Sequence, residues 1–127
     1  MSTRTWQMIE GGLVGAGAFV GVWVLDFPLW FPVALFLAWD ISALGYLAGP
    51  RVGAFTYNLV HNYGGPAIAG TVAALTTTPW LGAVALAWAF HVGVDRALGY
   101  GLKHNDDFQH THLGWIGKSR KQHESAH

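Results

Sequence analysis

The sequence predicts an all-α protein, a bundle of four transmembrane helices with both termini in the cytoplasm. Composition is the first reason, because 52% of the 127 residues are hydrophobic and only 11% are charged, whereas soluble domains average about a quarter charged residues. The second is the presence of four apolar segments close to the ~20 residues that cross a bilayer core. The third is the placement of basic residues on one side of the membrane.

The four apolar segments cover residues 8–25, 27–47, 52–76 and 79–102. Prolines 28, 50 and 79 stand in or beside the boundaries, and proline is tolerated in the first turn of a helix. A soluble helical bundle, the alternative, needs polar faces that three of these segments lack. The first segment contains Ala16-Gly17-Ala18, which resembles a signal-peptide cleavage site, but apolar residues continue to Leu25 and favour a retained helix.

Glycine and proline indicate how these helices pack and bend. The third segment contains Gly64-Gly65-Pro66, where we expect a kink, because Pro66 has no N–H to donate to the carbonyl of Asn62. In the first segment, Gly11-x-x-x-Gly15 and Gly17-x-x-x-Gly21 let helix backbones approach closely. This close packing serves either the bundle itself or a homodimer.

Basic residues set the expected orientation. They lie before the first segment, between the second and third, and around the end of the fourth, while the opposite side has only Asp26. By the positive-inside rule, both termini face the cytoplasm of a multi-pass inner (plasma) membrane protein. We therefore expect a transmembrane domain at 1–103 and a polar cytoplasmic tail at 104–127, folded back beneath the membrane as far as Gly117 and disordered over its last ten residues.

Three ionisable residues fall at one depth. Asp40 precedes Pro50 by ten residues, His61 follows it by eleven, and His91 precedes Gly101 by ten. At about 1.5 Å per residue, each lies about 15 Å from the cytoplasmic surface, near the bilayer midplane. Asp95 shares a helix face with His91. Such groups face the bundle interior and pair with each other, so Asp40, His61, His91 and Asp95 are expected to converge.

This set of side chains suits two kinds of chemistry. Two histidines and two aspartates are a ligand set for a divalent metal, namely zinc, iron or manganese. The same residues suit catalytic acid–base work, because histidine titrates near neutral pH. The structural alternative is a polar network that only joins helices, with Asp95 paired to Arg96 or Arg51. Tyr57 stands one helical turn before His61. The expected kink, together with His61, Asn58 and Asn62, favours a polar cavity.

Two stretches carry a family resemblance, DISALGYLAGPRVGAFTYNLVHNY and FHVGVDRALGYGLKHNDDFQHTHLGWIGK. They resemble a family of small bacterial membrane proteins named only as domain-of-unknown-function family 4260. The resemblance covers nearly the whole chain and implies the four-helix architecture. It also draws attention to His112, but it implies no activity. Its most specific residues are Asp40, Gly49–Arg51, Tyr57, Asn58, His61, His91, Asp95, Arg96, Gly99–Lys103, Phe108 and Thr111–Gly114.

Two functions of different classes follow from the sequence. The first is a membrane protein with a midplane Asp/His site that acts on a lipophilic ligand, with a metal or by acid–base chemistry. The second is a non-enzymatic accessory subunit or small transporter protomer, whose polar residues fix helix packing. The partners expected are the lipid bilayer and a homo-oligomer or larger membrane complex. The seven basic residues are balanced by seven acidic ones, so the chain lacks the excess positive charge that is typical of nucleic-acid-binding proteins.

Overall fold

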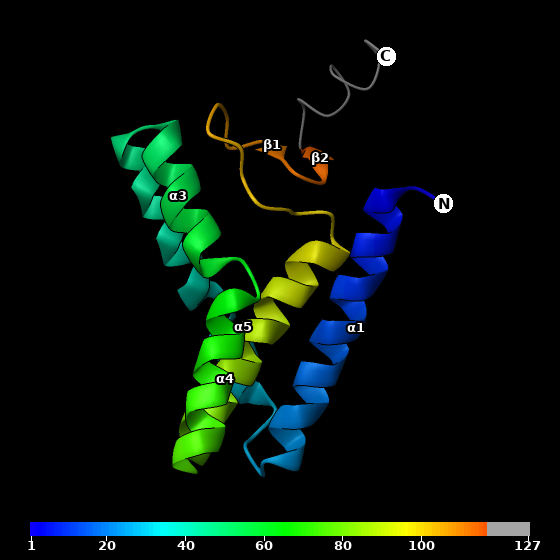
Figure 1. The fold of residues 1–127 in the computed structure, drawn as a ribbon, viewed down its shortest axis with the longest axis vertical. Coiled ribbons are helices and arrows are strands. Elements are labelled where there is room, and N and C mark those ends of the chain that lie inside the picture. The colour runs from blue at the N-terminus through cyan, green and yellow to red at the C-terminus, as the bar shows by residue number, and fades with distance from the viewer. Residues whose placement is uncertain (117–127) are drawn as a thin grey trace.

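A computed structural model describes residues 1–116 of the chain (Figure 1). Its described part is helical apart from one short hairpin, so the predicted all-α class is confirmed. The helices are α1 (Thr3–Val24), α2 (Trp30–Ala34), the 3-10 helix η1 (Phe36–Ala48), α3 (Pro50–Val60), α4 (Gly64–Thr76) and α5 (Pro79–Ala97). The hairpin pairs β1 (His110–Thr111) with β2 (Gly114–Trp115).

Helix α5 is the element on which the others assemble. In Figure 1, α1 and α4 lie on either side of it, and both pack directly against it. Helix α3 packs instead against η1, and η1 returns to contact α5. Helix α5 has more buried residues than any other helix of residues 1–116, and they include His91 and Asp95. It therefore brings both polar and apolar side chains to the centre of the molecule.

Glycines bring α1 and α5 into backbone contact. A Cβ atom added to Gly93 would lie 2.6 Å from both the Gly11 carbonyl oxygen and the Gly15 nitrogen. The predicted close approach at Gly11 and Gly15 is thus a contact inside the chain. Gly17, by contrast, has no atom within 4 Å of such a Cβ.

The third predicted helix is two helices, and the break comes earlier than the sequence indicates. Helix α3 ends at Val60, and α4 begins at Gly64, so residues 61–63 are the break. The expected kink at Gly64-Gly65-Pro66 is wrong in position. Pro66 lies in the first turn of α4, where its missing N–H would have no helical partner in any case.

The second predicted helix is also divided, into α2 and η1. A 3-10 run of 13 residues is long, because such runs seldom exceed 3–4 residues. Together, α2 and η1 form the stretch Trp30–Ala48. Within residues 1–116, this stretch and α1 are the two helical stretches that are long and apolar enough to cross a membrane. At 11 and 13 residues, α3 and α4 are each shorter than a single span.

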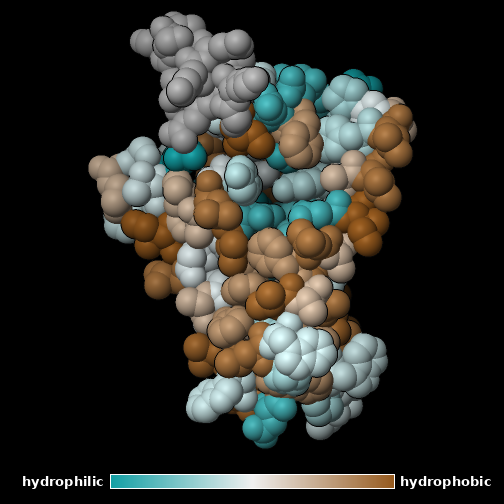
Figure 2. All heavy atoms as spheres, turned by 180° about the vertical axis from the view of Figure 1, so that it is seen from behind, coloured by the Kyte–Doolittle hydropathy of each residue, from teal (hydrophilic) through white to brown (hydrophobic). Residues whose placement is uncertain are grey.

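The outer surface is rich in large hydrophobic side chains. Leu13, Leu37, Leu47 and Leu75 are each more than 70% exposed. Figure 2 shows hydrophobic residues across the middle of the molecule and hydrophilic ones gathered toward the upper end. A large contiguous apolar surface indicates contact with a partner or a membrane.

The described part of the predicted tail folds back over the ends of α1 and α5. The backbones of Lys103 and Thr111 pair in an isolated antiparallel β-bridge. The Arg4 side chain donates a hydrogen bond to the Leu113 carbonyl at 2.8 Å. His112 Nε2 lies 2.9 Å from the side-chain oxygen of Gln7. The division into domains at residue 103 stays a prediction. The expected disorder of the last ten residues lies outside the described residues.

The glycine contact gives a stability prediction. We expect Gly93→Ala to lower the free energy of unfolding by about 1–3 kcal/mol, because the new methyl group would overlap the α1 backbone. Gly17→Ala is the control and should raise it by about 0.5–1 kcal/mol through helix propensity. Unfolding in detergent micelles, followed by circular dichroism, measures both. Equal effects of the two substitutions would contradict the close crossing.

Candidate metal centre

The four residues predicted to converge form one cluster. His61 Nε2 lies 3.0 Å from Asp40 Oδ1 and 3.1 Å from His91 Nε2. His91 Nε2 lies 3.1 Å from Asp95 Oδ2 and 3.3 Å from Asp40 Oδ1, and His61 Nε2 lies 3.7 Å from Asp95 Oδ2. One potential ligand atom from each residue lies within 4.8 Å of the other three. The predicted convergence is thus present in the structure.

Three elements supply these side chains. His91 and Asp95 are four residues apart on α5 and share one face of that helix. His61 is the capping residue directly after the last residue of α3, Val60, and Asp40 comes from η1. Both histidine side chains are completely buried and the Asp95 side chain is 10% exposed, whereas that of Asp40 is 44% exposed. Access to the cluster is therefore from the Asp40 side.

The His61 ring is fixed in orientation by α3. Its Nδ1 donates a hydrogen bond to the Tyr57 carbonyl at 2.9 Å, because a carbonyl oxygen can only accept. The Tyr57 ring stacks on the imidazole with 3.7 Å between centroids and an interplanar angle of 3°. Neutral His61 must then carry its lone pair on Nε2, toward the other three residues. A metal-ligating histidine typically has this outer hydrogen bond, which fixes the tautomer.

The cluster contains more acceptors than protons. Two carboxylates and the His61 Nε2 lone pair face the single Nε2 of His91, which can carry one proton. Asp95 Oδ2 and His91 Nδ1 are buried without a hydrogen bond of acceptable geometry among the described residues. Buried polar atoms are normally paired. A cation at the centre would satisfy all four inward-facing atoms at once.

The separations also fit a metal ion. Ligand atoms around a tetrahedral zinc ion, with bonds of about 2.0–2.2 Å, lie about 3.3–3.6 Å apart. Five of the six separations run from 3.0 to 3.7 Å, and all four atoms lie within 4.8 Å of one another. Histidine nitrogen and carboxylate oxygen are suitable ligands for zinc, iron or manganese. The donor set therefore fits a divalent metal in both chemistry and spacing.

The break after α3 is held by side chains. Trp88 Nε1 donates to the Val60 carbonyl at 2.6 Å, and Arg96 Nη2 donates to the His61 carbonyl at 2.8 Å. The Asn62 amide donates to the carbonyls of Asn58 and Leu59, at 2.6 and 3.1 Å. The last carbonyls of a helix otherwise have no partner. These bonds make a buried helix end acceptable and hold His61 at the cluster.

The other predicted site residues surround the cluster without joining it. Asn58 accepts from the Lys103 N–H at 2.6 Å and donates to its carbonyl at 2.8 Å, which anchors the chain after α5 to α3. Arg96 supports the break rather than pairing with Asp95. His112 lies apart from the cluster, with its Nδ1 accepting from the Leu102 N–H at 2.7 Å.

Sequence reasoning did not identify Lys103 or Ser42 as neighbours of the site. The Lys103 ammonium lies over the rings of Tyr57 and Phe108, at 4.8 and 3.9 Å from their centroids. Burial lowers the pKa of Lys103 to about 8, although Asp95 and Asp40 act in the opposite direction. Ser42 Oγ lies 3.4 Å from His61 Nδ1. Ser42 follows Asp40 by two residues, and this closeness in sequence was the only sign that Ser42 lies near the site.

The fold and the cluster define an all-helical protein with an Asp/His site held between its helices. A family model described as a domain of unknown function (DUF4260) matches residues 4–116. The chain belongs to this family, and the resemblance noted in the sequence is confirmed. The matched region includes all four clustered residues. Comparisons with curated proteins and with solved structures gave no match.

The hydrogen bond at the helix break can be tested by removing its donor. We expect Trp88→Phe to lower the free energy of unfolding by about 1–3 kcal/mol, because the buried Val60 carbonyl loses its partner. Trp23→Phe is the matched control, since Trp23 is 65% exposed, and it should change stability little. Thermal unfolding in detergent compares them. A Trp88→Phe protein as stable as the control would contradict the proposed role of the indole.

The buried Lys103 gives a pH prediction. Its pKa is about 8 in the folded chain against an ordinary 10.5, so between these values the unfolded state binds more protons. Stability should therefore rise as pH increases from about 8 to about 10.5. Lys103→Met removes this group and should flatten the rise. The check is denaturant unfolding of both proteins across this range, and parallel curves would show that Lys103 titrates normally.

Proposed function

We propose that this protein binds a divalent metal ion at His61, His91 and Asp95, with Asp40 beside it, and uses the ion to hydrolyse a lipophilic substrate within the membrane. The observation that carries the proposal is the convergence of four lone-pair atoms from three elements, all within 4.8 Å of one another, with 3.0–3.7 Å between the atoms of five of the six pairs. With both imidazoles neutral and no metal present, most of these atoms would face one another without a proton between them.

The four residues have different roles in this proposal. His61, His91 and Asp95 are the buried members and act as ligands, which gives the His₂-carboxylate set of several zinc hydrolases. A divalent metal bound there supplies Lewis acidity and lowers the pKa of a bound water. Asp40 is the exposed member, so it is placed to accept a proton from water as the general base. Tyr57 orients His61 through its carbonyl and its ring.

The membrane location follows from the outer surface. Two helical stretches in the described part of the chain meet the length and composition of a span, and the exposed leucines of η1 and α4 continue the apolar surface. We propose that all the helices lie in the inner membrane as a multi-pass bundle, with α3 and α4 together forming one broken span and both termini cytoplasmic. A substrate reaching Asp40 from the bilayer would then be lipophilic.

Metal content tests this proposal directly. Protein purified without a histidine tag should hold about one zinc, iron or manganese ion per chain by elemental analysis. His61→Ala and His91→Ala should lose the ion, because each removes a ligand, whereas His104→Ala in the tail should keep it. A metal-free wild-type chain that tolerates His61→Ala would leave the packing role, in an accessory subunit or transporter protomer, as the explanation.

Two isosteric variants separate ligand from base. Asp95→Asn should release the metal, and Asp40→Asn should retain it while losing hydrolysis of a long-chain p-nitrophenyl ester by at least a hundred-fold, a typical effect of losing a general base. Metal content and ester hydrolysis are measured on the same samples. Loss of metal from both variants would make Asp40 a ligand, and full hydrolysis by Asp40→Asn would exclude it as the base.

A further inference from the structure

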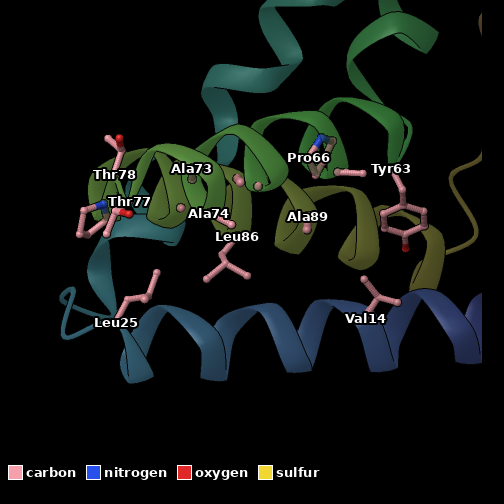
Figure 3. Close-up of a pocket in the computed structure, with 15 residues that line it drawn as sticks. Val14, Leu25, Tyr63, Pro66, Ala73, Ala74, Thr77, Thr78, Leu86 and Ala89 are labelled. Atoms are coloured by element: carbon pink, nitrogen blue, oxygen red, sulfur yellow. The ribbon is translucent and has the colours of Figure 1, made fainter.

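An apolar groove lies between α1 and α4, with α5 as its floor (Figure 3). Its volume is about 690 Å³, within the 300–1,000 Å³ typical of small-molecule sites. In Figure 3, Leu25 and Thr78 mark one end, while Val14 and Tyr63 mark the other. Small residues such as Gly70 and Gly82 line it and leave the space open.

A second, smaller cavity of about 180 Å³ begins where the groove ends. Tyr63 lines both spaces, and Gly11, one helical turn before Val14, lines the second. The remaining walls are polar: Gln7, Glu10, Arg96 and His112. An apolar groove leading to a polar cavity matches the shape of a molecule with a hydrocarbon tail and a polar head.

The charge in the polar cavity favours an anionic head. Arg96 is 7% exposed, and within residues 1–116 it forms no salt bridge with a carboxylate. It donates only to the carbonyls of His61 and Tyr100, so three of its five N–H groups remain. A buried charge normally has a partner. Glu10 is on the exposed rim, where solvent screens its charge.

One further observation indicates a missing partner at this place. The Tyr63 hydroxyl is buried with no hydrogen bond among the described residues, and Tyr63 lines both spaces. The polar cavity thus has a buried guanidinium in its wall, that of Arg96, and a hydroxyl donor without a partner in Tyr63. A carboxylate accepts hydrogen bonds from both tyrosine and arginine, and pairs with arginine in a bidentate manner.

We propose that this site binds a fatty acid, with its chain in the groove and its carboxylate at Arg96 and Tyr63. The groove follows α1 from Val14 to Leu25, which is about 16 Å at 1.5 Å per residue. An extended backbone of three bonds per residue advances about 1.2 Å per bond, and at that rate a hydrocarbon chain of about fourteen carbons matches the length. A cavity of 180 Å³ holds a carboxylate with a few waters, at about 30 Å³ per water.

The fatty-acid site does not depend on the proposed metal. It is formed by α1, α4, α5 and the tail hairpin, and it includes none of the four clustered residues. Binding should therefore persist after treatment with a chelator, and a failure of the metal proposal leaves this one intact. The link between them is Arg96, which contacts the His61 carbonyl from the side of the cavity.

Equilibrium binding of radiolabelled myristate to the delipidated full chain in maltoside micelles tests the proposal. One myristate should bind per chain, and tetradecanol and tetradecyltrimethylammonium should compete at least ten-fold less well. Tyr63→Phe should weaken myristate about ten-fold, because it removes one hydrogen bond to a charged group. Tetradecanol competing as well as myristate would overturn the carboxylate assignment.

Two glycine variants test the groove itself. Gly82→Leu should reduce myristate affinity at least ten-fold by filling the groove; a Cβ there meets only ordinary contacts of 3.4 and 3.8 Å, so the helix accommodates it. Gly17→Leu adds the same side chain where nothing lies within 4 Å, and it should bind within two-fold of wild type. Unchanged binding by Gly82→Leu, with circular dichroism showing a folded chain, would overturn the proposal.

A second copy of the chain is the competing occupant of the groove. The sequence contains no cysteine, so Ala74→Cys places a single thiol on the groove wall. In native membranes this variant should not cross-link to itself, because the groove holds a fatty acid. Efficient disulfide-linked dimers would assign the groove to a protein interface and overturn the proposal.

Discussion

Ionisable side chains buried inside an apolar molecule must be paired with one another, and this requirement determines how the helices are arranged. His61 Nε2, His91 Nε2 and the two carboxylates meet within 4.8 Å, although the chain delivers them from three elements. Isolated, each would carry a large desolvation cost. Placed together, they need α3 to end just before His61, η1 to pass beside His61, and α5 to present two residues on one face.

Most of the cluster could be predicted from sequence because it depends on regular geometry. Counting residues from the predicted cytoplasmic boundaries put Asp40, His61 and His91 at one depth, since a helix rises by a constant amount per residue. The spacing of His91 and Asp95 fixed their common face. These inferences need only helix parameters and the cost of burying charge, and they survive even though two of the four helices are divided in the structure.

The position of the helix break could not be predicted, because distant residues determine it. Pro66 and its glycines indicated a break, but α3 ends before Gly64 because Trp88 and Arg96 supply donors to the carbonyls of Val60 and His61. Such tertiary hydrogen bonds leave no local signal in the sequence. The long 3-10 winding of η1 and the groove between α1 and α4 are likewise properties of packing, which hydrophobic periodicity does not describe.

The two donors that hold the break also fix the register of α5. Trp88 and Arg96 are eight residues apart, about 12 Å along the helix axis, and His91 and Asp95 lie between them. Sliding α5 by one residue would move it about 1.5 Å along its axis and turn it about 100°. This shift would break the hydrogen bonds of Trp88 and Arg96 and would move the side chains of His91 and Asp95 out of the cluster. These two hydrogen bonds hold α5 in one register, so the four residues of the Asp/His cluster come together as a unit or not at all.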